Sequence, residues 1–467
     1  MQMRLPFKQT EPVSRSRMRN GLANRLDPSD RAFHEWYRFV LSYPPHLVSG
    51  YLEDFELAPG SAVLDPFCGT GTTLVESKLR GMRALGLEAN PFAHFASSVK
   101  TDWEVDPGAL LTAAEEIAAE VRRSLLAEGV DDDLLSEGPP EGIALRELPP
   151  EAAKLLITGS ISPIPLHKTL TLLDRLNMRS GERYHRHALL ALAKALVFSI
   201  GNLHFGPEVG VGKAKADAHV ISPWLTEVRR MAADLRAIGG GQHQPCQAFM
   251  ADARDIANVM APESVDAVIT SPPYPNEKDY TRTTRLESVV LGFVKNMYEL
   301  RRNKKMLVRS NTRSVYREDD DDSFVAEHPE IQRIAEAIEK RRIELGKTSG
   351  FERMYGRVTQ LYFGGMARHF AELRSVLRPG ARLAYVVGDQ ASYLRVMIRT
   401  GELLADIAQS LGYELVRIDL FRTRFATATK EQLREEVVVL RWPGRKRTRR
   451  SANPLREALV GEWRIGG

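Results

Sequence analysis

The chain of 467 residues has little cysteine and no long apolar run. Its two cysteines, Cys68 and Cys246, are too few for a disulfide framework or a four-thiolate zinc site. No segment approaches the roughly 20 consecutive apolar residues that a membrane span needs. The first twenty residues also lack the apolar stretch of a secretory signal. These absences predict a protein of a reducing, intracellular compartment with no membrane partner.

Metal-binding spacing is also missing. The eleven histidines form no His-x-x-x-His or Cys–His pattern, so no metal site is predicted. A Gly210-Val211-Gly212-Lys213 segment lacks the following Ser or Thr of a nucleotide-binding loop. Chemistry that depends on a metal or on ATP is therefore not expected from the sequence.

Positive charge is present in three clusters, although the net charge is only +5. Residues 1–25 carry Glu11 as their single acid, residues 301–317 carry no acid, and residues 445–450 read Arg-Lys-Arg-Thr-Arg-Arg. Clustered Lys and Arg side chains are what a phosphate-contacting surface requires. Solvated termini and a solvated helix face are the alternative for each cluster taken singly. Three clusters in one chain favour nucleic acid as partner.

Strands and helices are predicted to alternate along much of the chain. Short apolar runs predict strands at 61–65, 84–88, 248–252, 265–269, 381–387, 413–420 and 436–442. Helical spacing predicts helices at 30–58, 72–80, 106–128, 185–204, 223–237, 356–377 and 399–411. An α/β fold follows, with a seven-stranded, mostly parallel sheet closed by an antiparallel pair.

Two segments interrupt this alternation, and they define the predicted domain organisation. The core comprises 61–104, 245–275 and 356–442; a helical insertion covers 105–244, and a charged insertion covers 276–355. Residues 1–60 form a basic arm and a helical segment, and 443–467 form a basic tail.

A first motif follows the first predicted strand. Val63-Leu64-Asp65-Pro66-Phe67-Cys68-Gly69-Thr70-Gly71-Thr72-Thr73 reads as a strand, a glycine turn and a helix start. Such a turn brings backbone N–H groups and a helix N-terminus toward a ligand. Glu88 and Asp252 end the next two strands in sequence, where an open α/β sheet binds its ligands. Surface carboxylates at strand ends are the alternative for each acid by itself.

A second motif ends the fourth predicted strand. Asp266-Ala267-Val268-Ile269-Thr270-Ser271-Pro272-Pro273-Tyr274 reads as a strand that runs into Ser-Pro-Pro-Tyr. Together, the two motifs resemble motifs I and IV of the S-adenosylmethionine-dependent amino-methyltransferases of DNA, which methylate N4 of cytosine or N6 of adenine. Tyr43-Pro44-Pro45-His46-Leu47-Val48 is similar to motif X of that family.

The resemblance implies a class I methyltransferase fold, which is Rossmann-like, and S-adenosyl-L-methionine as cofactor. The implied cofactor-binding residues are Asp65, Phe67, Cys68, Gly69, Gly71, Thr72, Glu88, Asp252 and Ala253. The implied catalytic residues are Ser271, Pro272, Pro273 and Tyr274. In the family, the first two hold the base amine and the tyrosine stacks on the extruded base.

The charged insertion begins directly at the expected base pocket, which favours DNA contact there. The predicted nucleic-acid-binding residues are Tyr280, Arg282, Arg285, Arg301, Arg302, Lys304, Lys305, Arg309 and Arg313. The helical insertion is a second candidate for DNA contact, or alternatively a helical buttress. The predicted partners are double-stranded DNA and a cognate restriction endonuclease, and the predicted location is cytoplasmic, at the nucleoid.

The function predicted from these residues is site-specific DNA methylation at cytosine N4. Serine in the first position of Ser271-Pro272-Pro273-Tyr274 favours cytosine within the family. Adenine N6, guanine N2 of RNA and an inactive nucleic-acid-binding relic remain as alternatives. Pro245-Cys246-Gln247 imitates the nucleophile motif of the cytosine-C5 enzymes but precedes the third strand, so a covalent thiolate mechanism is not predicted.

Overall fold

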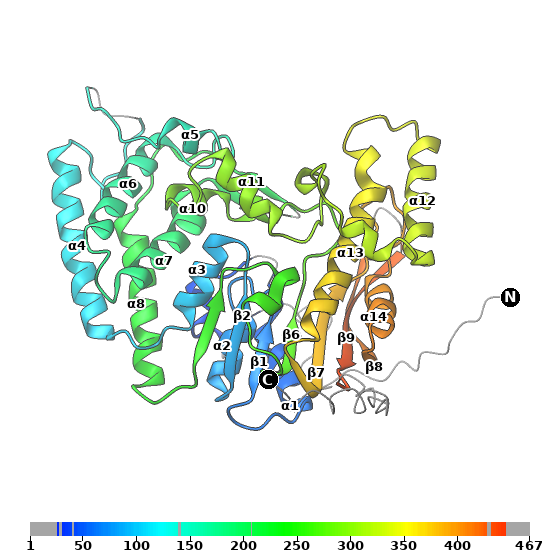
Figure 1. The fold of residues 1–467 in the computed structure, drawn as a ribbon. Helices are drawn as coiled ribbons and strands as arrows, with labels where there is room; N and C mark the ends of the chain where they lie inside the picture. Colours follow the sequence, from blue (N-terminus) through cyan, green and yellow to red (C-terminus); the bar gives the residue numbers. More distant parts are fainter. Residues whose placement is uncertain are drawn as a thin grey trace, which may run out of the picture.

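Seven strands form one sheet in the order β5–β2–β1–β6–β7–β9–β8 (Figure 1). The structure is a computed structural model that describes residues 26–27, 30–39, 42–138, 142–206, 208–426 and 431–444. The strands are β1 (Ala62–Asp65), β2 (Arg83–Leu87), β5 (Cys246–Phe249), β6 (Val265–Thr270), β7 (Leu377–Gly388), β8 (Glu414–Ala426) and β9 (Glu431–Arg441). Strand β9 runs antiparallel between β7 and β8, and β5, β2, β1, β6 and β7 pair in parallel. The predicted seven-stranded, mostly parallel sheet is confirmed.

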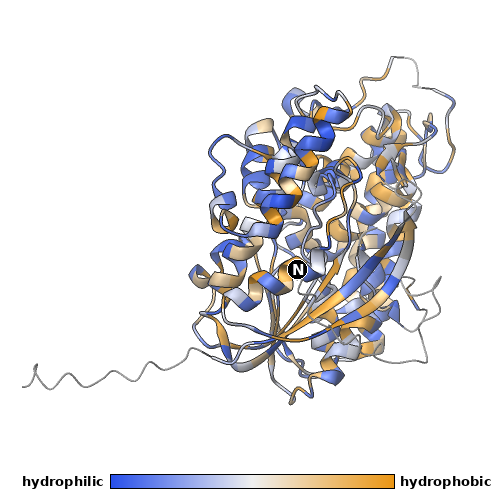
Figure 2. Ribbon diagram, turned by 90° about the vertical axis from the view of Figure 1, so that its right-hand side faces the viewer, coloured by the Kyte–Doolittle hydropathy of each residue, from blue (hydrophilic) through white to orange (hydrophobic). Residues whose placement is uncertain are grey.

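Apolar side chains alternate between the two faces of the sheet, as the period of a strand requires. On β6, Val268 packs into one apolar cluster, whereas Ala267 and Ile269 pack into the cluster on the opposite face. The first cluster includes residues of α13 (Tyr355–Leu373) and α14 (Thr400–Ser410), and the second includes residues of α1 (Pro45–Asp54). Hydrophobic colour accordingly runs along the central strands in Figure 2.

Short helices follow the first two strands and complete the region around the site. They are α2 (Thr72–Leu79) and α3 (Pro91–Lys100). Asn90 caps α3 through its side-chain oxygen, which accepts hydrogen bonds from the backbone N–H groups of Phe92 and Ala93. The Asn-Pro pair therefore begins this helix.

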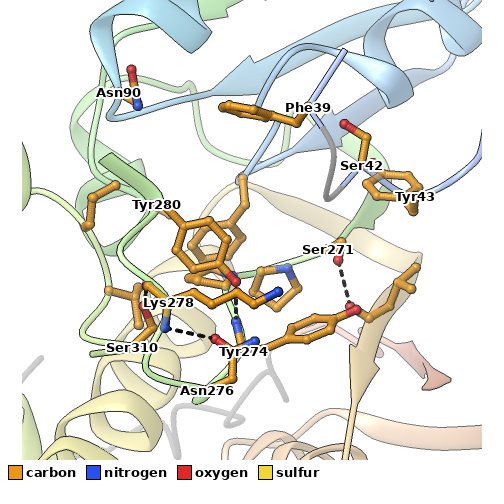
Figure 3. Close-up of a pocket in the computed structure, with 18 of the residues that line it drawn as sticks. Phe39, Ser42, Tyr43, Asn90, Ser271, Tyr274, Asn276, Lys278, Tyr280 and Ser310 are labelled. Carbon is orange, nitrogen blue, oxygen red and sulfur yellow. Dashed lines mark hydrogen bonds between the residues drawn. The ribbon is translucent and has the colours of Figure 1, made fainter. Parts of the chain in front are cut away.

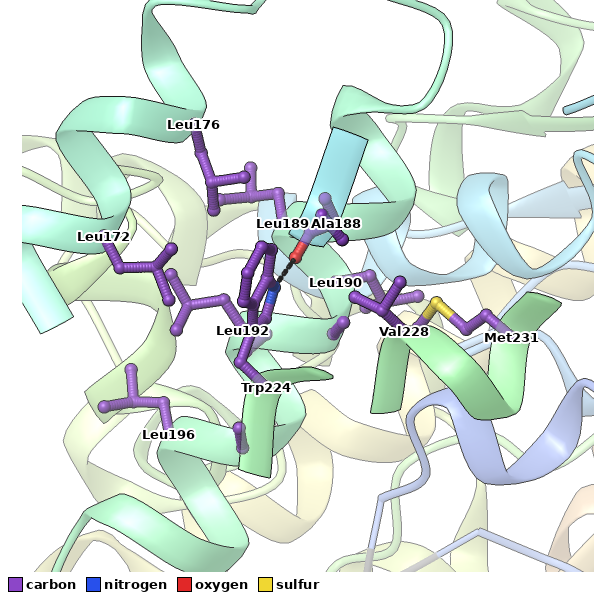
Figure 4. Close-up of a cluster of buried hydrophobic side chains, with 14 of the residues drawn as sticks. Leu172, Leu176, Ala188, Leu189, Leu190, Leu192, Leu196, Trp224, Val228 and Met231 are labelled. Carbon is purple, nitrogen blue, oxygen red and sulfur yellow. Dashed lines mark hydrogen bonds between the residues drawn. The ribbon is translucent and has the colours of Figure 1, made fainter. Parts of the chain in front are cut away.

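The helical insertion is built around a large apolar core, part of which is shown in Figure 4 and to which residues of α2 and α3 also contribute. Its helices are α4 (Pro107–Ala127), α5 (Pro150–Ala153), α6 (Pro163–Asn177), α7 (His185–Ala195) and α8 (Ile221–Ile238). Trp224 is fully buried among leucines of α6 and α7, and its indole N–H donates to the carbonyl of Ala188 at 2.9 Å. A π-helical turn, Leu196–Ile200, and a small hairpin of β3 (Leu203–Phe205) and β4 (Val209–Val211) follow α7, where the sequence predicts helix through 204.

The charged insertion contains four further helices: α9 (Tyr280–Thr283), α10 (Arg285–Val290), α11 (Met297–Lys305) and α12 (Pro329–Glu344). Leu286 and Val290 of α10 pack into the core of the helical insertion. The two insertions are therefore joined by a shared apolar core above one half of the sheet (Figure 1).

The predicted helix over 30–58 is wrong in its first half. Among the described residues that precede α1, the sequence His34–Trp36 forms a 3₁₀ turn and no long helix is present. The carboxylate of Asp234 on α8 accepts hydrogen bonds from the Phe33 backbone N–H at 3.2 Å and the Trp36 indole N–H at 2.8 Å. Contacts with the helical insertion therefore determine the path of this segment. The basic clusters of residues 1–25 and 445–450 lie outside the described residues.

Within the described part of the chain, no helix combines the length and the apolar character that crossing a bilayer demands. The same residues hold no group of three or more His, Cys, Asp or Glu side chains arranged to bind a metal ion.

Candidate active site

One cavity of about 540 Å³ opens at the carboxyl ends of β1, β2, β6 and β7. This volume lies within the range of small-molecule sites. Its walls come from the turn after β1, the end of β2, the Ser271–Tyr274 segment after β6 and the residues after β7. Segments more than 200 residues apart in the sequence thus meet around one space, at the edge where open α/β sheets bind ligands.

Glu88 is the carboxylate at the end of β2 that faces the cavity. One of its oxygens accepts the backbone N–H of Gly69 at 2.8 Å, and the other accepts that of Asn90 at 2.7 Å. Each carboxylate oxygen keeps a further acceptor position, so Glu88 can still accept two hydrogen bonds from a ligand. Burial raises the pKa of Glu88 to about 7, partly offset by these backbone bonds.

The turn after β1 contributes Phe67, Cys68, Gly69 and Thr72 to the cavity wall, as predicted for cofactor-binding residues. Gly71 does not line the cavity. Its backbone φ is +83°, and a Cβ placed there would lie 3.0 Å from the Cβ of Ser97. This glycine is therefore required for the shape of the turn and its packing against α3.

Asp65 lies beneath this turn and is fully buried. It accepts hydrogen bonds from the Tyr43 hydroxyl at 2.8 Å, the Thr270 hydroxyl at 2.5 Å and the Phe67 backbone N–H at 3.1 Å. It does not line the cavity. Burial raises the pKa of Asp65 and these hydrogen bonds lower it in part. Its position links the motif X-like segment, the first motif and the end of β6.

Asp252 is placed differently from the prediction. Its carboxylate forms an ion pair with Arg254, with Nη2 at 2.6 Å from Oδ2, and also accepts the Arg254 backbone N–H at 2.8 Å. Its neighbours Ala251 and Ala253 line the cavity, but Asp252 does not. Arg254 therefore occupies the acceptor positions of the Asp252 carboxylate that were predicted to bind a ligand.

The Ser271–Tyr274 segment forms the other end of the cavity (Figure 3). The Ser271 hydroxyl donates to the carbonyl of Val386 at 3.0 Å, and the Tyr274 backbone N–H donates to the Tyr280 hydroxyl at 3.1 Å. Burial raises the pKa of Tyr274 above its usual value and that of Tyr280 to about 12, so both phenols are neutral at physiological pH. All four residues of the segment line the cavity.

The predicted nucleic-acid-binding residues separate into two groups. Lys304 and Arg309 are buried and paired, with Asp279 at 2.7 Å and Asp319 at 2.8 Å. Internal acids therefore pair with the charges of these two predicted contacts. The exposed members of the set are Arg301, Arg302, Lys305 and Arg313, although Lys305 is bonded to Glu318.

The remaining three predicted contacts lie beside the cavity. Tyr280 lines it. Arg282 donates to the carbonyl of Val209 on the β3–β4 hairpin at 3.4 Å, and Arg285 donates to the carbonyls of Thr281 and Leu155. These two arginines join the charged insertion to the helical insertion.

The sequence prediction missed several cavity residues. They are Phe39, Ser42, Asn90, Asn276, Lys278, Ser310, Gln390, Arg422 and Glu435. Gln390 follows the end of β7, so the rule that ligands bind at the carboxyl ends of strands could have found it. Arg422 and Glu435 lie on the antiparallel strands β8 and β9, where that rule gives no signal.

No protein-family model matches the chain. The chain is similar over most of its length to two proteins that are named as Type II methyltransferases. It is 24% identical over 453 residues to M.BsoBI of Geobacillus stearothermophilus, covering 88% of this chain and 84% of that protein. It is 24% identical over 458 residues to M.AvaI of a Nostoc species, covering 90% of this chain and 88% of that protein.

Two solved structures are also similar. TrmN from Thermus thermophilus aligns with a TM-score of 0.30 and 12% identity, over 88% of this chain and 52% of that one. The rRNA methyltransferase aviRa from Streptomyces viridochromogenes aligns with a TM-score of 0.28 and 11% identity, over 87% and 88%. The similarity to the Type II methyltransferases confirms the resemblance that the two motifs carry.

Proposed function

We propose that the protein is a DNA methyltransferase that transfers a methyl group from S-adenosyl-L-methionine to the exocyclic N4 amine of a flipped-out cytosine. One observation carries this proposal: Glu88 with its glycine turn and the Ser271–Tyr274 segment open into the same cavity. The similarity to proteins named as Type II methyltransferases, over 88% of the chain or more, supports it.

The cavity fits this cofactor chemically. Glu88 has two acceptor positions free for the paired hydroxyls of a ribose, and Phe67 and Leu87 supply apolar wall beside it. Phe67, Cys68 and Gly69 of the turn would lie along the donor. When bound, S-adenosyl-L-methionine supplies an electrophilic methyl group on a sulfonium.

Residues of the chain then determine how the base amine meets that methyl group. A cytosine amine is a weak nucleophile because its lone pair is delocalised into the ring. The hydroxyl hydrogen of Ser271 is directed at the carbonyl of Val386, and its oxygen, which also lies beside the Tyr274 hydroxyl, keeps a lone pair that can accept an amine N–H. The Pro272 carbonyl accepts the second N–H. Two acceptors at these positions orient the nitrogen lone pair toward the donor.

The Ser271–Tyr274 segment also determines which other groups contact the base. Pro272 and Pro273 have no backbone N–H to compete for the base and hold the loop in a fixed path. The neutral ring of Tyr274 offers a face on which a flipped base stacks. When bound, the donor would supply the methyl group and leave as a neutral thioether, and the amine proton that the methyl group replaces would pass to water.

Methyl transfer to mixed genomic DNA tests the proposal. Purified protein with labelled S-adenosyl-L-methionine is expected to yield N4-methylcytosine after digestion to nucleosides. Ser271→Ala is expected to lower the rate about 100-fold or more while donor binding persists, because it removes one of the two amine acceptors. N6-methyladenine as product would overturn the base assignment, and labelled RNA without labelled DNA would overturn the substrate class.

A cognate restriction endonuclease is the proposed partner, as for a modification enzyme whose product protects DNA from cleavage. Host DNA from cells that express the protein is then expected to resist one restriction endonuclease that cuts DNA from control cells. Host DNA that stays sensitive to every endonuclease tested would count against this partner.

A further inference from the structure

A second polar group lines the cavity beyond the Ser271–Tyr274 segment, and the proposed chemistry leaves it unused. It consists of Gln390, Arg422 and Glu435. In the sheet, Gly388 at the end of β7 pairs with Glu435 on β9, and Glu435 pairs with Arg422 on β8. Because neighbouring strands lie about 4.8 Å apart, this row continues the cavity wall from β7 across β9 to β8, roughly 10 Å beyond β7.

The glycine at the end of β7 makes room for this group. A Cβ on Gly388 would lie 3.2 Å from the Tyr274 ring, 3.3 Å from Cγ of Glu435 and 3.6 Å from Nε2 of Gln390. Tyr274, on which the base is proposed to stack, therefore meets both polar side chains above Gly388. The second polar group is thus contiguous with the proposed base site.

Arg422 is fixed in this group with one edge of its guanidinium free. Its Nε and Nη2 donate to the two carboxylate oxygens of Glu435 at 2.5 and 2.8 Å. Its Nη1 makes no hydrogen bond to the described residues. The carboxylate cancels the charge of the guanidinium, so the free N–H groups suit a neutral carbonyl rather than a phosphate.

Gln390 adds a buried amide at the same place. It is 2% exposed, yet it lines the cavity. Its Nε2 donates to the carbonyl of Gly388 at 3.3 Å, and its Oε1 accepts no hydrogen bond from any residue that the structure describes. Because Gln390 lines the cavity, this oxygen is available to accept a hydrogen bond from a ligand or water there.

Cytosine and adenine both carry an exocyclic amine, but they differ in the ring atoms that follow the amine along the Watson–Crick edge. Cytosine presents its ring nitrogen N3 and then the carbonyl O2, both acceptors. Adenine presents N1 and then a C–H group, which accepts nothing. A donor placed beyond the amine site therefore distinguishes a pyrimidine with a ring carbonyl from adenine.

We propose that Arg422, held by Glu435, donates a hydrogen bond to the O2 carbonyl of the flipped base and so makes the site selective for cytosine. This inference rests on the proposed function, since it concerns the base that the same cavity receives. Gln390 lines the path between the amine site and Arg422. This polar group therefore affects which base is bound, whereas the donor binds at the other end of the cavity.

Substitution of Arg422 tests this proposal. Arg422→Gln is expected to lower kcat/KM for N4-methylcytosine formation about 10- to 100-fold, as for removal of a hydrogen bond from a charged donor. Arg422→Lys, which keeps the charge without the fork, is expected to recover only part of the rate. The fraction of N6-methyladenine in the product is expected to rise in Arg422→Gln, while the affinity for S-adenosyl-L-methionine stays unchanged.

A matched control lies on the same two strands. Arg441 on β9 pairs with Glu414 on β8 at 2.8 Å, at the far end of both strands and outside the cavity. Arg441→Gln removes a cross-strand Arg–Glu pair of the same kind and is expected to leave methylation unchanged.

The salt dependence of DNA binding distinguishes a contact of Arg422 with a base from a contact with a phosphate. This dependence is expected to be equal in wild type and Arg422→Gln.

The outcomes distinguish failure of this inference from failure of the proposed function. If the wild type forms N4-methylcytosine and Arg422→Gln forms it at the wild-type rate, the role of Arg422 is overturned. A reduced salt dependence in Arg422→Gln would overturn it as well, by assigning Arg422 to a phosphate. If the wild type itself forms no N4-methylcytosine, the proposed function fails before Arg422 is tested.

Discussion

At the scale of single residues, the bonds that a side chain already makes decide what it can do for a ligand. Glu88 and Asp252 both follow strand ends and are equivalent in the sequence. Among the described residues, Glu88 is bonded to backbone N–H groups and keeps acceptor positions toward the cavity, whereas Arg254 occupies the carboxylate of Asp252. Spacing along the chain predicted both acids as cofactor-binding residues, but it could not show that Glu88 faces the cavity while the side chain of Arg254 folds back onto Asp252.

Donor affinity is predicted to depend on pH through Glu88. Burial raises its pKa from 4.5 to about 7, so the carboxylate becomes protonated as the pH falls through 7. A protonated carboxyl has less acceptor capacity for a ribose hydroxyl, so affinity for S-adenosyl-L-methionine is expected to fall between pH 8 and pH 6. Calorimetric titration across this range measures the effect.

Glu88→Gln is the variant that isolates this group. It is expected to bind the donor about 10- to 100-fold more weakly at pH 8 and to show no change toward pH 6. Glu53→Gln, on the exposed side of α1, serves as the control and is expected to keep the wild-type profile. A pH-dependent affinity that survives in Glu88→Gln would assign the titration to another group.

At the scale of elements, the strands were predictable because their apolar residues are continuous and buried. All seven predicted strands are present, with ends that differ by a few residues. The first half of the helix predicted over 30–58 is absent because Asp234 of α8, distant in sequence, binds the Phe33 backbone and the Trp36 side chain. The β3–β4 hairpin was missed because its strands have three residues each and are not fully buried.

Gly71 provides a prediction for the turn between β1 and α2. Its φ of +83° is a left-handed conformation, which costs an L-residue with a side chain about 1–2 kcal/mol. A new Cβ would also press on Ser97. Gly71→Ala is therefore expected to lower the free energy of unfolding by about 1–3 kcal/mol, measured by denaturant titration, and to weaken donor binding.

The control for this prediction lies in the next helix back along the chain. Gly50 of α1 has no atom within 4 Å of its Cβ position and is helical. Gly50→Ala is expected to raise the free energy of unfolding by about 0.5–1 kcal/mol. Destabilisation of equal size by both substitutions would contradict the role given to the turn.

At the scale of the whole molecule, the charged insertion and the carboxyl ends of the strands line one cavity, and the positive charges of that insertion are divided between buried and exposed positions. The composition of 301–317 predicted a basic surface but could not show which charges face inward. Lys304 and Arg309 hold the insertion together through acids that lie 25 and 10 residues away in sequence. Arg301 and Arg302 on α11 remain exposed.

The exposed pair is predicted to contribute to the salt dependence of DNA binding. In Arg301→Gln/Arg302→Gln, the slope of log K against log salt concentration is expected to become shallower by about 0.9 for each DNA phosphate that an arginine no longer neutralises. Thermal stability is expected to stay unchanged. Fluorescence anisotropy with a labelled duplex at several salt concentrations measures the slope.

Two further variants serve as controls for that measurement. Arg333→Gln removes an exposed arginine of α12 that pairs with Glu330, and it is expected to leave the slope as in wild type. Arg309→Gln is expected to lower stability instead, because it leaves the nearly buried Asp319 without its partner. An unchanged slope in the double variant would remove α11 from the DNA-binding surface.

The order of the strands has a consequence for synthesis on the ribosome. The centre of the sheet joins β1 to β6, and the Ala62 amide and Asp266 carboxylate that bond across this junction are 204 residues apart. At about 5–20 residues per second, β1 and β2 emerge roughly 10–40 seconds before their central partner exists. During that interval the nascent chain carries an apolar strand with one open edge, which is a template for aggregation. Folding yield in cells is therefore expected to depend on the rate of translation and on chaperones that shield the first hundred residues.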